Sequence, residues 1–303
     1  MAALERTIPL PHAVHLSRTL APLRHGRYDP TMWLREDAAW RATRTPEGPA
    51  TVHLAVAGGR VVVRAWGPGG AWAVDAAPDL VGASDDTSGF RPRHPLVAEL
   101  ARRSPGLRIP RSQAVVEALV PTVLAQKVTG VEAARAYVAI VRAFGERAPG
   151  PAGDAGLRLP PCPVRLAAAP SCAFHPLGIE RKRADTIRRL CGTAARVEEV
   201  TGVPPGLARR RLQALPGIGP WTAAEVALVS LGDADAVPLD DFHLPHQVSW
   251  ALAGEARGDD TRMLELLAPF AGHRGRVLRH LAVAGIRAPR FGPRMPVRSI
   301  ASI

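Results

Sequence analysis

The order of apolar and polar residues changes character about one third of the way along the chain. In the first part, apolar and polar residues alternate in short runs such as 51–56 (TVHLAV) and 60–66 (RVVVRAW), with Gly58 and Gly59 between them. Alternation with a period of two across a short glycine turn is typical of a β-hairpin. Shorter runs predict further strands at 16–20, 31–33 and 71–74. We therefore expect a β-rich first part.

From about residue 94 the apolar residues recur with the period of a helix. One predicted helix begins after a cap at Ser112 and runs as far as Leu124. The others are predicted at 96–103, 131–144, 163–169, 180–191, 206–213, 221–231, 243–253, 260–269 and 273–284. Turn-forming residues in 82–95 mark a domain boundary, and 146–161 has the composition of a surface loop. The predicted class is α+β: an N-terminal β-containing domain (1–93), an all-α domain (94–286) and a basic irregular tail (287–303).

Composition narrows the class of protein further. The chain has 303 residues, of which 47% are hydrophobic and 22% charged, so a folded globular protein is expected. No window has the roughly 18 consecutive apolar residues of a membrane span. Glu5 and Arg6 interrupt the segment where a signal peptide would be apolar. We therefore expect a cytoplasmic protein without membrane association.

The net charge of +12 does not by itself indicate a nucleic-acid partner. The only lysines are Lys127 and Lys182, and arginine enrichment with abundant alanine, glycine and proline also follows from a GC-rich genome. The distribution is more informative. Residues 1–93 hold 11 basic and 9 acidic residues, whereas 94–303 hold 28 and 18. Any polyanion partner is therefore expected on the second part.

The cysteines and histidines do not predict a metal centre. Cys162, Cys172 and Cys191 form no CxxC pair, which excludes a zinc ribbon and a four-cysteine iron–sulfur cluster. His243 and His246 have nearly the spacing of metal ligands, but no third ligand is near them in the sequence and Pro245 separates them. We expect no metal ligands among these residues.

The segment 212–223 (LQALPGIGPWTA) carries the strongest chemical signal. Gly217 and Gly219 lie in a short turn between two predicted helices. Such a turn leaves backbone N–H groups free to bind a phosphate oxygen, whereas the alternative is an ordinary helix–helix turn that needs glycine. With Thr222 following and Arg209, Arg210 and Arg211 on the preceding helix, we favour phosphate binding.

The motif LPGIGPWTA at 215–223, followed by AVPLDD at 236–241, resembles the signature of the helix-hairpin-helix/Gly-Pro-Asp DNA glycosylase superfamily. Asp241 follows Trp221 by twenty residues, the spacing between hairpin and catalytic aspartate in that family. The resemblance covers about 94–285. A β-rich N-terminal domain is similar to the arrangement of the DNA-3-methyladenine glycosylase II branch.

The resemblance implies cleavage of an N-glycosidic bond in damaged double-stranded DNA, as in base-excision repair. A carboxylate beside C1′ stabilises the positive charge that develops on the sugar, and Asp241 is the candidate. Asp240 is the neighbouring alternative, and an Asp-Asp pair can also serve only as a helix cap. Because Trp221 stands where lyase members of the family carry a lysine, we expect a monofunctional hydrolase without lyase activity.

A base inside a duplex is reached only after it has flipped out, and a side chain then fills the gap. The resemblance places this plug at the turn of Gln126 and Lys127, after the helix 123–129 (VLAQKVT). Gln126 can bond to base edges. Lys127 replaces the usual wedge, and it either inserts or contacts phosphate. Both residues can also be solvated helix-end residues.

The resemblance also implies a pocket for the flipped base. Trp221 would stack on the base, or it belongs to the core. Glu225 and His273 occupy positions where the 3-methyladenine branch has aromatic residues. Glu225 would attract a cationic base or is an exposed helix residue, and His273 would stack or is a surface histidine.

The sequence therefore predicts a monomeric glycosylase for alkylated purines of the 3-methyladenine type. No cofactor is expected, although the family binds a monovalent cation at the hairpin. One alternative is a non-catalytic DNA-binding protein with the same hairpin, and another is a glycosylase for oxidised or deaminated purines.

Overall fold

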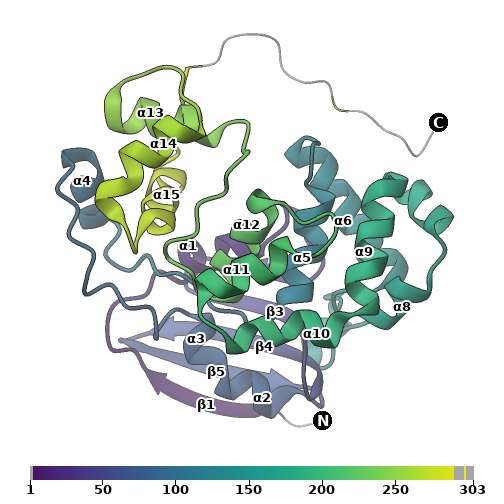
Figure 1. Ribbon diagram of the computed structural model, residues 1–303. Coiled ribbons are helices and arrows are strands. Elements are labelled where there is room, and N and C mark those ends of the chain that lie inside the picture. The colour runs from purple at the N-terminus through teal and green to yellow at the C-terminus, as the bar shows by residue number, and fades with distance from the viewer. Residues whose placement is uncertain (1–2, 290–296, 298–303) are drawn as a thin grey trace.

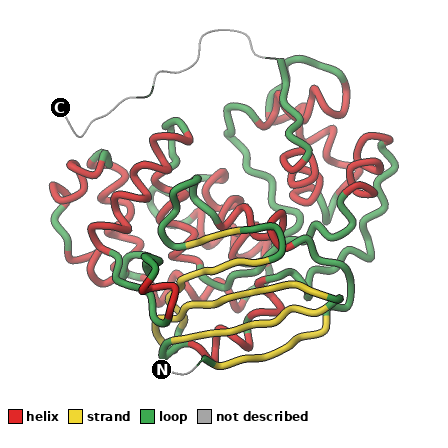
Figure 2. The backbone as a smooth tube through the Cα atoms, turned by 180° about the vertical axis from the view of Figure 1, so that it is seen from behind, coloured by secondary structure: helices red, strands yellow, loops and turns green. Residues whose placement is uncertain are grey.

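The computed structural model describes residues 3–289 and 297. Its N-terminal part contains one antiparallel sheet of five strands in the order β1-β5-β4-β3-β2. Figure 2 shows its strands one above another in the lower part of the molecule, with most of the helices above them. The strands are β1 (Leu4–Pro9), β2 (Met32–Leu34), β3 (Ala38–Thr45), β4 (Gly48–Ala57) and β5 (Arg60–Trp66). The predicted β-rich first part and the α+β class are confirmed.

The predicted hairpin is the β4–β5 pair. Gly58 and Gly59 form its turn with φ angles of +55° and +71°, which favour glycine at both positions. Val61 and Val63 on β5 are fully buried, while their neighbours are more exposed. This alternation follows from the period of two along a strand with one covered face.

Two of the predicted strands are helices. The segment around 16–20 is α1 (Leu16–Leu20), and that around 71–74 is α2 (Gly70–Asp75), whereas 31–33 overlaps β2 as predicted. Runs of four or five apolar residues fit either period, so packing decides between them. Helix α2 packs against β1, β4 and β5, and α3 (Ala77–Leu80) follows it directly.

The second part of the chain is helical, as predicted. Its longer helices are α4 (Pro95–Arg103), α5 (Val115–Leu124), α6 (Gly130–Phe144), α8 (Pro163–Ala168), α9 (Arg181–Gly192), α11 (Pro205–Gln213), α12 (Pro220–Ser230), α13 (Leu244–Ala253), α14 (Asp260–Leu267) and α15 (Arg274–Val283). Short elements that the sequence pattern did not indicate are η1 (Ala21–Leu23), α7 (Pro151–Asp154), η2 (Ser171–Leu177), α10 (Ala194–Glu198), η3 (Glu199–Gly202) and η4 (Ala268–Phe270).

The hydrophobic cores divide the molecule differently from the boundary predicted at 93/94. One core runs continuously from the sheet into the helices α5–α12. A second core joins α4 to α13–α15. In Figure 1 these four helices form a group of their own above the sheet, beside the group around α5, α11 and α12. The sheet is therefore part of the main core.

Two glutamates fix the N-terminal end of α5. Glu117, in its first turn, accepts a hydrogen bond from Arg41 Nη2 on β3 at 2.8 Å, and its two carboxylate oxygens share the Thr43 hydroxyl as a donor at 3.0 and 2.9 Å, which ties the helix to the sheet. Glu198 accepts from the backbone N–H groups of Val115 and Val116 at the start of the helix. The cap predicted at Ser112 is therefore wrong: the N-terminus of α5 is capped by a carboxylate from α10.

Most of the predicted tail 287–303 lies outside the described residues. Among the residues that are described, no helix is long and apolar enough to cross a membrane.

Candidate active site

The turn between α11 and α12 is the predicted hairpin, and its two glycines have different reasons to be glycine. Gly217 has φ = +91°, and a Cβ there would lie 2.7 Å from Thr186 Oγ1 on α9. Gly219 has an extended conformation, and a Cβ there would meet no atom within 4 Å. The protein thus packs closely against Gly217 and leaves the space beside Gly219 open.

The open side of the hairpin is the N-terminus of α12. No side chain caps this helix, Pro220 occupies its first position, and Gly219 is exposed. The next N–H groups, of Trp221 and Thr222, have no acceptor within the helix because they belong to its first turn. The geometry matches an anion site, in which the N–H groups and the helix dipole both favour negative charge.

Gln126 lies on the hairpin. Its side-chain amide donates to Gly217 O at 3.0 Å and to Thr222 Oγ1 at 2.9 Å, so the turn after α5 and the hairpin are joined. The Thr222 side chain faces inward, because the residue is only 2% exposed. Lys127 follows at the tip, exposed, with φ = +56°. The structure thus uses the Gln126 amide inside the protein and presents Lys127 to solvent.

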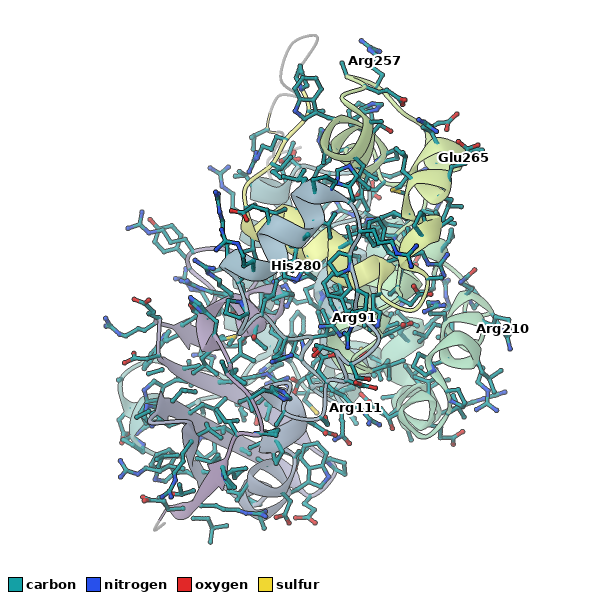
Figure 3. The ribbon with its side chains drawn as sticks, turned by 90° about the vertical axis from the view of Figure 1, so that its left-hand side faces the viewer. Arg91, Arg111, Arg210, Arg257, Glu265 and His280 are labelled. Atoms are coloured by element: carbon teal, nitrogen blue, oxygen red, sulfur yellow. The ribbon has the colours of Figure 1, made fainter. Side chains whose placement is uncertain are left out.

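The three arginines before the hairpin have different environments. Arg209 forms an ion pair with Asp233, whose side chain is 5% exposed, so its guanidinium is held by the protein. Arg210 and Arg211 are exposed, and Figure 3 shows Arg210 at the edge of the molecule. The prediction that all three face DNA therefore needs correction for Arg209, because the buried carboxylate beside it requires a counter-charge.

Asp241 lies in the connection between α12 and α13 and is held by three N–H donors. Trp221 Nε1 donates to its Oδ2 at 2.9 Å, and the backbone N–H groups of His243 and Leu244 donate to its Oδ1 at 2.7 and 2.8 Å. The residue therefore caps α13 and also contacts the hairpin helix. Asp240, by contrast, is exposed with φ = +65°. Only Asp241 contacts Trp221.

A cavity of about 180 Å³ lies between the sheet and the helices, with Trp221 in its wall. An engineered cavity of ~150 Å³ is known to bind benzene, so this volume suits an aromatic ring system. The lining residues come from the N-terminal part (Pro22, Leu23, His25, Thr31, Met32, Arg41, Ala42), from the segment before α5 (Ser112, Ala114), from α5 and the turn after it (Glu117, Ala118, Pro121, Thr122, Ala125), from α6 (Tyr137), from the loop before α8 (Pro160) and from α12 (Trp221, Glu225, Val229).

Much of the wall opposite α12 is polar. Arg41 and Glu117 form a nearly buried ion pair at 2.8 Å. His25 packs edge-on against the Tyr137 ring with centroids 4.6 Å apart. Burial lowers the pKa of His25, although Asp29 opposes the effect, and burial also raises the pKa of Tyr137 well above its ordinary value. Both side chains are therefore neutral at pH 7.

Glu225 lies one helical turn after Trp221 and lines the same cavity. It is not the exposed helix residue of the alternative interpretation. Burial, and next the charge of Asp241, raise the pKa of Glu225 to about 7, while Arg279 on α15 opposes the shift. Both effects disfavour the charged form of a carboxyl group. Glu225 therefore changes its charge near neutral pH.

His273 does not line this cavity. Its ring accepts a hydrogen bond from Arg276 Nε at 3.2 Å and lies 5.4 Å from the Phe90 ring. Arg276 in turn pairs with Asp85 through both terminal nitrogens, at 2.7 and 2.6 Å. This buried pair turns the start of α15 towards the segment 84–94. The prediction of His273 as a pocket residue is therefore corrected.

The N-terminal part supplies cavity-lining residues such as His25 and Arg41, which the sequence pattern does not predict. Arg41 and Glu117 are 76 residues apart, and His25 and Tyr137 belong to different parts of the chain. No local pattern brings them together. Across the described residues, no group of three or more histidine, cysteine or acidic residues could hold a metal ion.

The chain is similar to known proteins both in sequence and in fold. No family model matches the chain. A segment of 144 residues (47% of this chain) is 35% identical to the "Probable bifunctional transcriptional activator/DNA repair enzyme AlkA" of Mycobacterium tuberculosis, of which it covers 28%. A segment of 149 residues (48% of this chain) is 32% identical to DNA-3-methyladenine glycosylase 2 of Escherichia coli K12, of which it covers 51%. The chain thus matches about half or less of the length of these curated relatives.

The solved structures cover nearly the whole chain. The 3-methyladenine DNA glycosylase of Archaeoglobus fulgidus superposes with a TM-score of 0.76 at 19% identity, over 92% of this chain and 97% of its own. This chain therefore has the same fold as that structure. A structure of MBOgg1 with a low-affinity DNA ligand gives a TM-score of 0.68 at 16% identity, over 93% of this chain and 97% of its own. The resemblance that the hairpin motif predicts is confirmed by these structures and by the sequence relatives.

Proposed function

We propose that this protein is a DNA glycosylase that hydrolyses the N-glycosidic bond of alkylated purines. The observation that carries the proposal is the contact between Asp241 and Trp221. It joins a carboxylate to the wall of a cavity of about 180 Å³, directly beside the uncapped hairpin. A backbone site, a carboxylate and a base-sized cavity in one place are the parts that the reaction needs.

Each part has a task in the reaction. The N–H groups beside Gly219 hold a DNA phosphate, with Arg210 and Arg211 nearby as counter-charges. The flipped base enters the cavity and stacks on Trp221. Asp241 then lies beside the sugar, where its carboxylate stabilises the oxocarbenium-like state and orients the attacking water.

Hydrolysis without strand cleavage is the expected course. A lyase step needs an amine that forms a Schiff base with the sugar. Trp221 occupies the position after the hairpin, and the two lysines, Lys127 and Lys182, are exposed and do not line the cavity. The product is therefore an abasic site in an intact strand.

The names of the relatives favour alkylated bases. The E. coli relative is named for 3-methyladenine, and so is the A. fulgidus structure. A likeness to an 8-oxoguanine glycosylase/lyase from Clostridium acetobutylicum, with a TM-score of 0.61 at 14% identity over 83% of this chain and 98% of its own, makes oxidised purines the second class to test.

The test is base release from duplexes that carry 3-methyladenine, hypoxanthine, ethenoadenine or 8-oxoguanine. We expect release of 3-methyladenine, and strand breaks only after treatment with alkali. Breaks without alkali would contradict the monofunctional mechanism. DNA binding without release of any base would instead favour a non-catalytic DNA-binding protein.

A further inference from the structure

Glu225 is a carboxylate that lines the cavity and forms no hydrogen bond to the described part of the protein, although the charge of Arg279 acts on it. Within the described residues its side chain forms no hydrogen bond and no ion pair, although it lines the cavity between Trp221 and Val229. These three residues follow each other at intervals of four along one face of α12. Trp221 reaches Asp241, so Glu225 lies one turn farther along the helix from that carboxylate.

A second polar group in the cavity wall also lacks a partner. Ser112 is 4% exposed, its hydroxyl forms no hydrogen bond, and its backbone N–H donates to Val229 O at 2.9 Å. The hydroxyl therefore belongs to the wall near the next turn of α12 after Glu225. Buried polar groups without partners are uncommon, because each loses its hydrogen bonds to water. Together with the Glu225 carboxylate, which forms no hydrogen bond to the described residues, this hydroxyl indicates that a polar ligand completes the site.

The charges around Glu225 leave a negative excess when its carboxyl group is ionised. Arg41 is neutralised by Glu117 within the cavity wall. Asp241 and Arg279 act on Glu225 from the α12–α13 connection and from α15, with opposite signs. His25 and Tyr137 are neutral at pH 7, as argued above. Asp29, which acts on His25 and Tyr137, is a further carboxylate in this region. The ionised cavity therefore has an excess of negative charge, which a cationic base would reduce.

We propose that Glu225 is the specificity-determining residue of the cavity, and that its carboxylate selects purines carrying a positive charge by pairing with the base as it stacks on Trp221. This inference rests on the proposed function, because it assumes that the cavity receives the flipped base. Purines alkylated at N3 or N7 carry this charge in DNA, whereas hypoxanthine and ethenoadenine are neutral. An aromatic side chain would contribute only the face of its ring, whereas a carboxylate offers a full charge and two acceptor oxygens.

The direct test is a binding measurement that needs no catalysis. The permanently cationic 3,9-dimethyladeninium and the neutral 9-methyladenine are titrated by calorimetry into the full chain, its Glu225→Gln variant and a Glu265→Gln control. Glu265 is a suitable control because it is an exposed carboxylate on α14, at the edge of the molecule in Figure 3. Glutamine keeps the size of the side chain and removes its charge.

We expect the wild-type chain and the control to prefer the cation, and Glu225→Gln to lose about ten- to hundredfold in affinity for the cation alone. This factor corresponds to one hydrogen bond between charged partners. Equal loss for both probes, or an unchanged preference, would overturn the proposal. A wild-type chain that does not prefer the cation would overturn it as well.

The pH dependence gives an independent reading of the same charge. Because the pKa of Glu225 is about 7 in the empty cavity, wild-type affinity for the cation should rise from pH 6 to pH 8 as the carboxyl group ionises. The glutamine variant should show no such rise. A rise that persists in the variant would assign the titration to another group and overturn the proposal.

Base release then separates this inference from the proposed function. Glu225→Gln should slow release of 3-methyladenine from duplex DNA more than release of hypoxanthine. Failure of the proposed function would appear as absence of any release by the wild-type chain. The binding preference would remain measurable in that case.

Discussion

Substitution by alanine should destabilise the fold at Gly217 far more than at Gly219, because only Gly217 is required by the fold. Gly217 combines a φ of +91° with a close approach to Thr186, whereas Gly219 has neither feature. A left-handed conformation costs a residue with a Cβ about 1–2 kcal/mol. Inserting a methyl group into a tightly packed contact costs about 1–3 kcal/mol. Gly217→Ala should therefore reduce the free energy of unfolding by about 2–5 kcal/mol, and Gly219→Ala by less than about 0.5 kcal/mol.

A double-mutant cycle separates the two contributions at Gly217. Thr186→Ala removes Oγ1 and Cγ2, which would lie 2.7 and 2.8 Å from the new Cβ, and leaves its own Cβ at 3.4 Å. In that background, Gly217→Ala should cost only the conformational part, about 1–2 kcal/mol. The free energy of unfolding is measured by urea denaturation followed by circular dichroism, after a check that the transitions are two-state.

DNA affinity completes the comparison. Gly219→Ala places a methyl group at the open side of the hairpin, where we propose that a phosphate binds. Its affinity for a duplex with an abasic site, measured by fluorescence anisotropy, should fall by about tenfold, in line with one or two lost hydrogen bonds to a charged group. Equal destabilisation by Gly219→Ala and Gly217→Ala would contradict the conclusion that only Gly217 is required by the fold. Wild-type DNA affinity of Gly219→Ala would contradict phosphate binding beside Gly219.

Three further predictions concern contacts elsewhere in the fold. Asp85→Asn should reduce the free energy of unfolding by about 3–5 kcal/mol, because it leaves the buried Arg276 uncompensated. Glu99→Gln, in an exposed ion pair, should change it far less in the same urea titration. Gln126→Ala should reduce the free energy of unfolding by about 1–3 kcal/mol, because two hydrogen bonds to the hairpin are lost. It should also weaken DNA binding in the anisotropy assay. If neither the stability nor the affinity changes, Gln126 does not hold the hairpin in place. Burial lowers the pKa of His280 to about 4, so its contribution to stability is present above pH 6.5 and is lost as the pH falls towards 4. His280→Leu should therefore flatten the pH dependence of Tm between pH 6.5 and 4. A curve parallel to that of the wild type would refute the assignment.

The fold was predictable where the apolar period is long or where turn chemistry is explicit. Helix α6 and the β4–β5 hairpin match their predicted segments closely, because fifteen residues of helical period and a Gly-Gly turn each allow one interpretation. The pattern predicts strands where the structure has α1 and α2, because five or six residues are too few to distinguish a helical period from a strand period. Strand β3 was missed altogether because alanines and arginines along it hide the alternation.

The site was predictable as far as local motifs reach. Trp221 and Asp241, which the motif singles out twenty residues apart, form a hydrogen bond in the structure. Glu225 lines the same cavity as Trp221 because it lies four residues later on the same helix. His273 does not line the cavity, because it contacts Arg276, which pairs with Asp85 in the segment before α4, far away in the sequence. The Arg41–Glu117 pair joins a strand to a helix 76 residues away, and such pairings are decided by tertiary packing alone.

We propose that Asp241 performs the chemistry of base release. Single-turnover release of 3-methyladenine from duplex DNA tests it most directly, with Asp240→Asn as the matched control because Asp240 is the exposed neighbour. We predict that Asp241→Asn lowers the release rate by at least about 100-fold, the typical effect of removing one group that stabilises transition-state charge. Asp241→Asn should bind DNA with nearly the wild-type affinity, and Asp240→Asn should release the base at nearly the wild-type rate. Release by Asp241→Asn at the wild-type rate would contradict the claim.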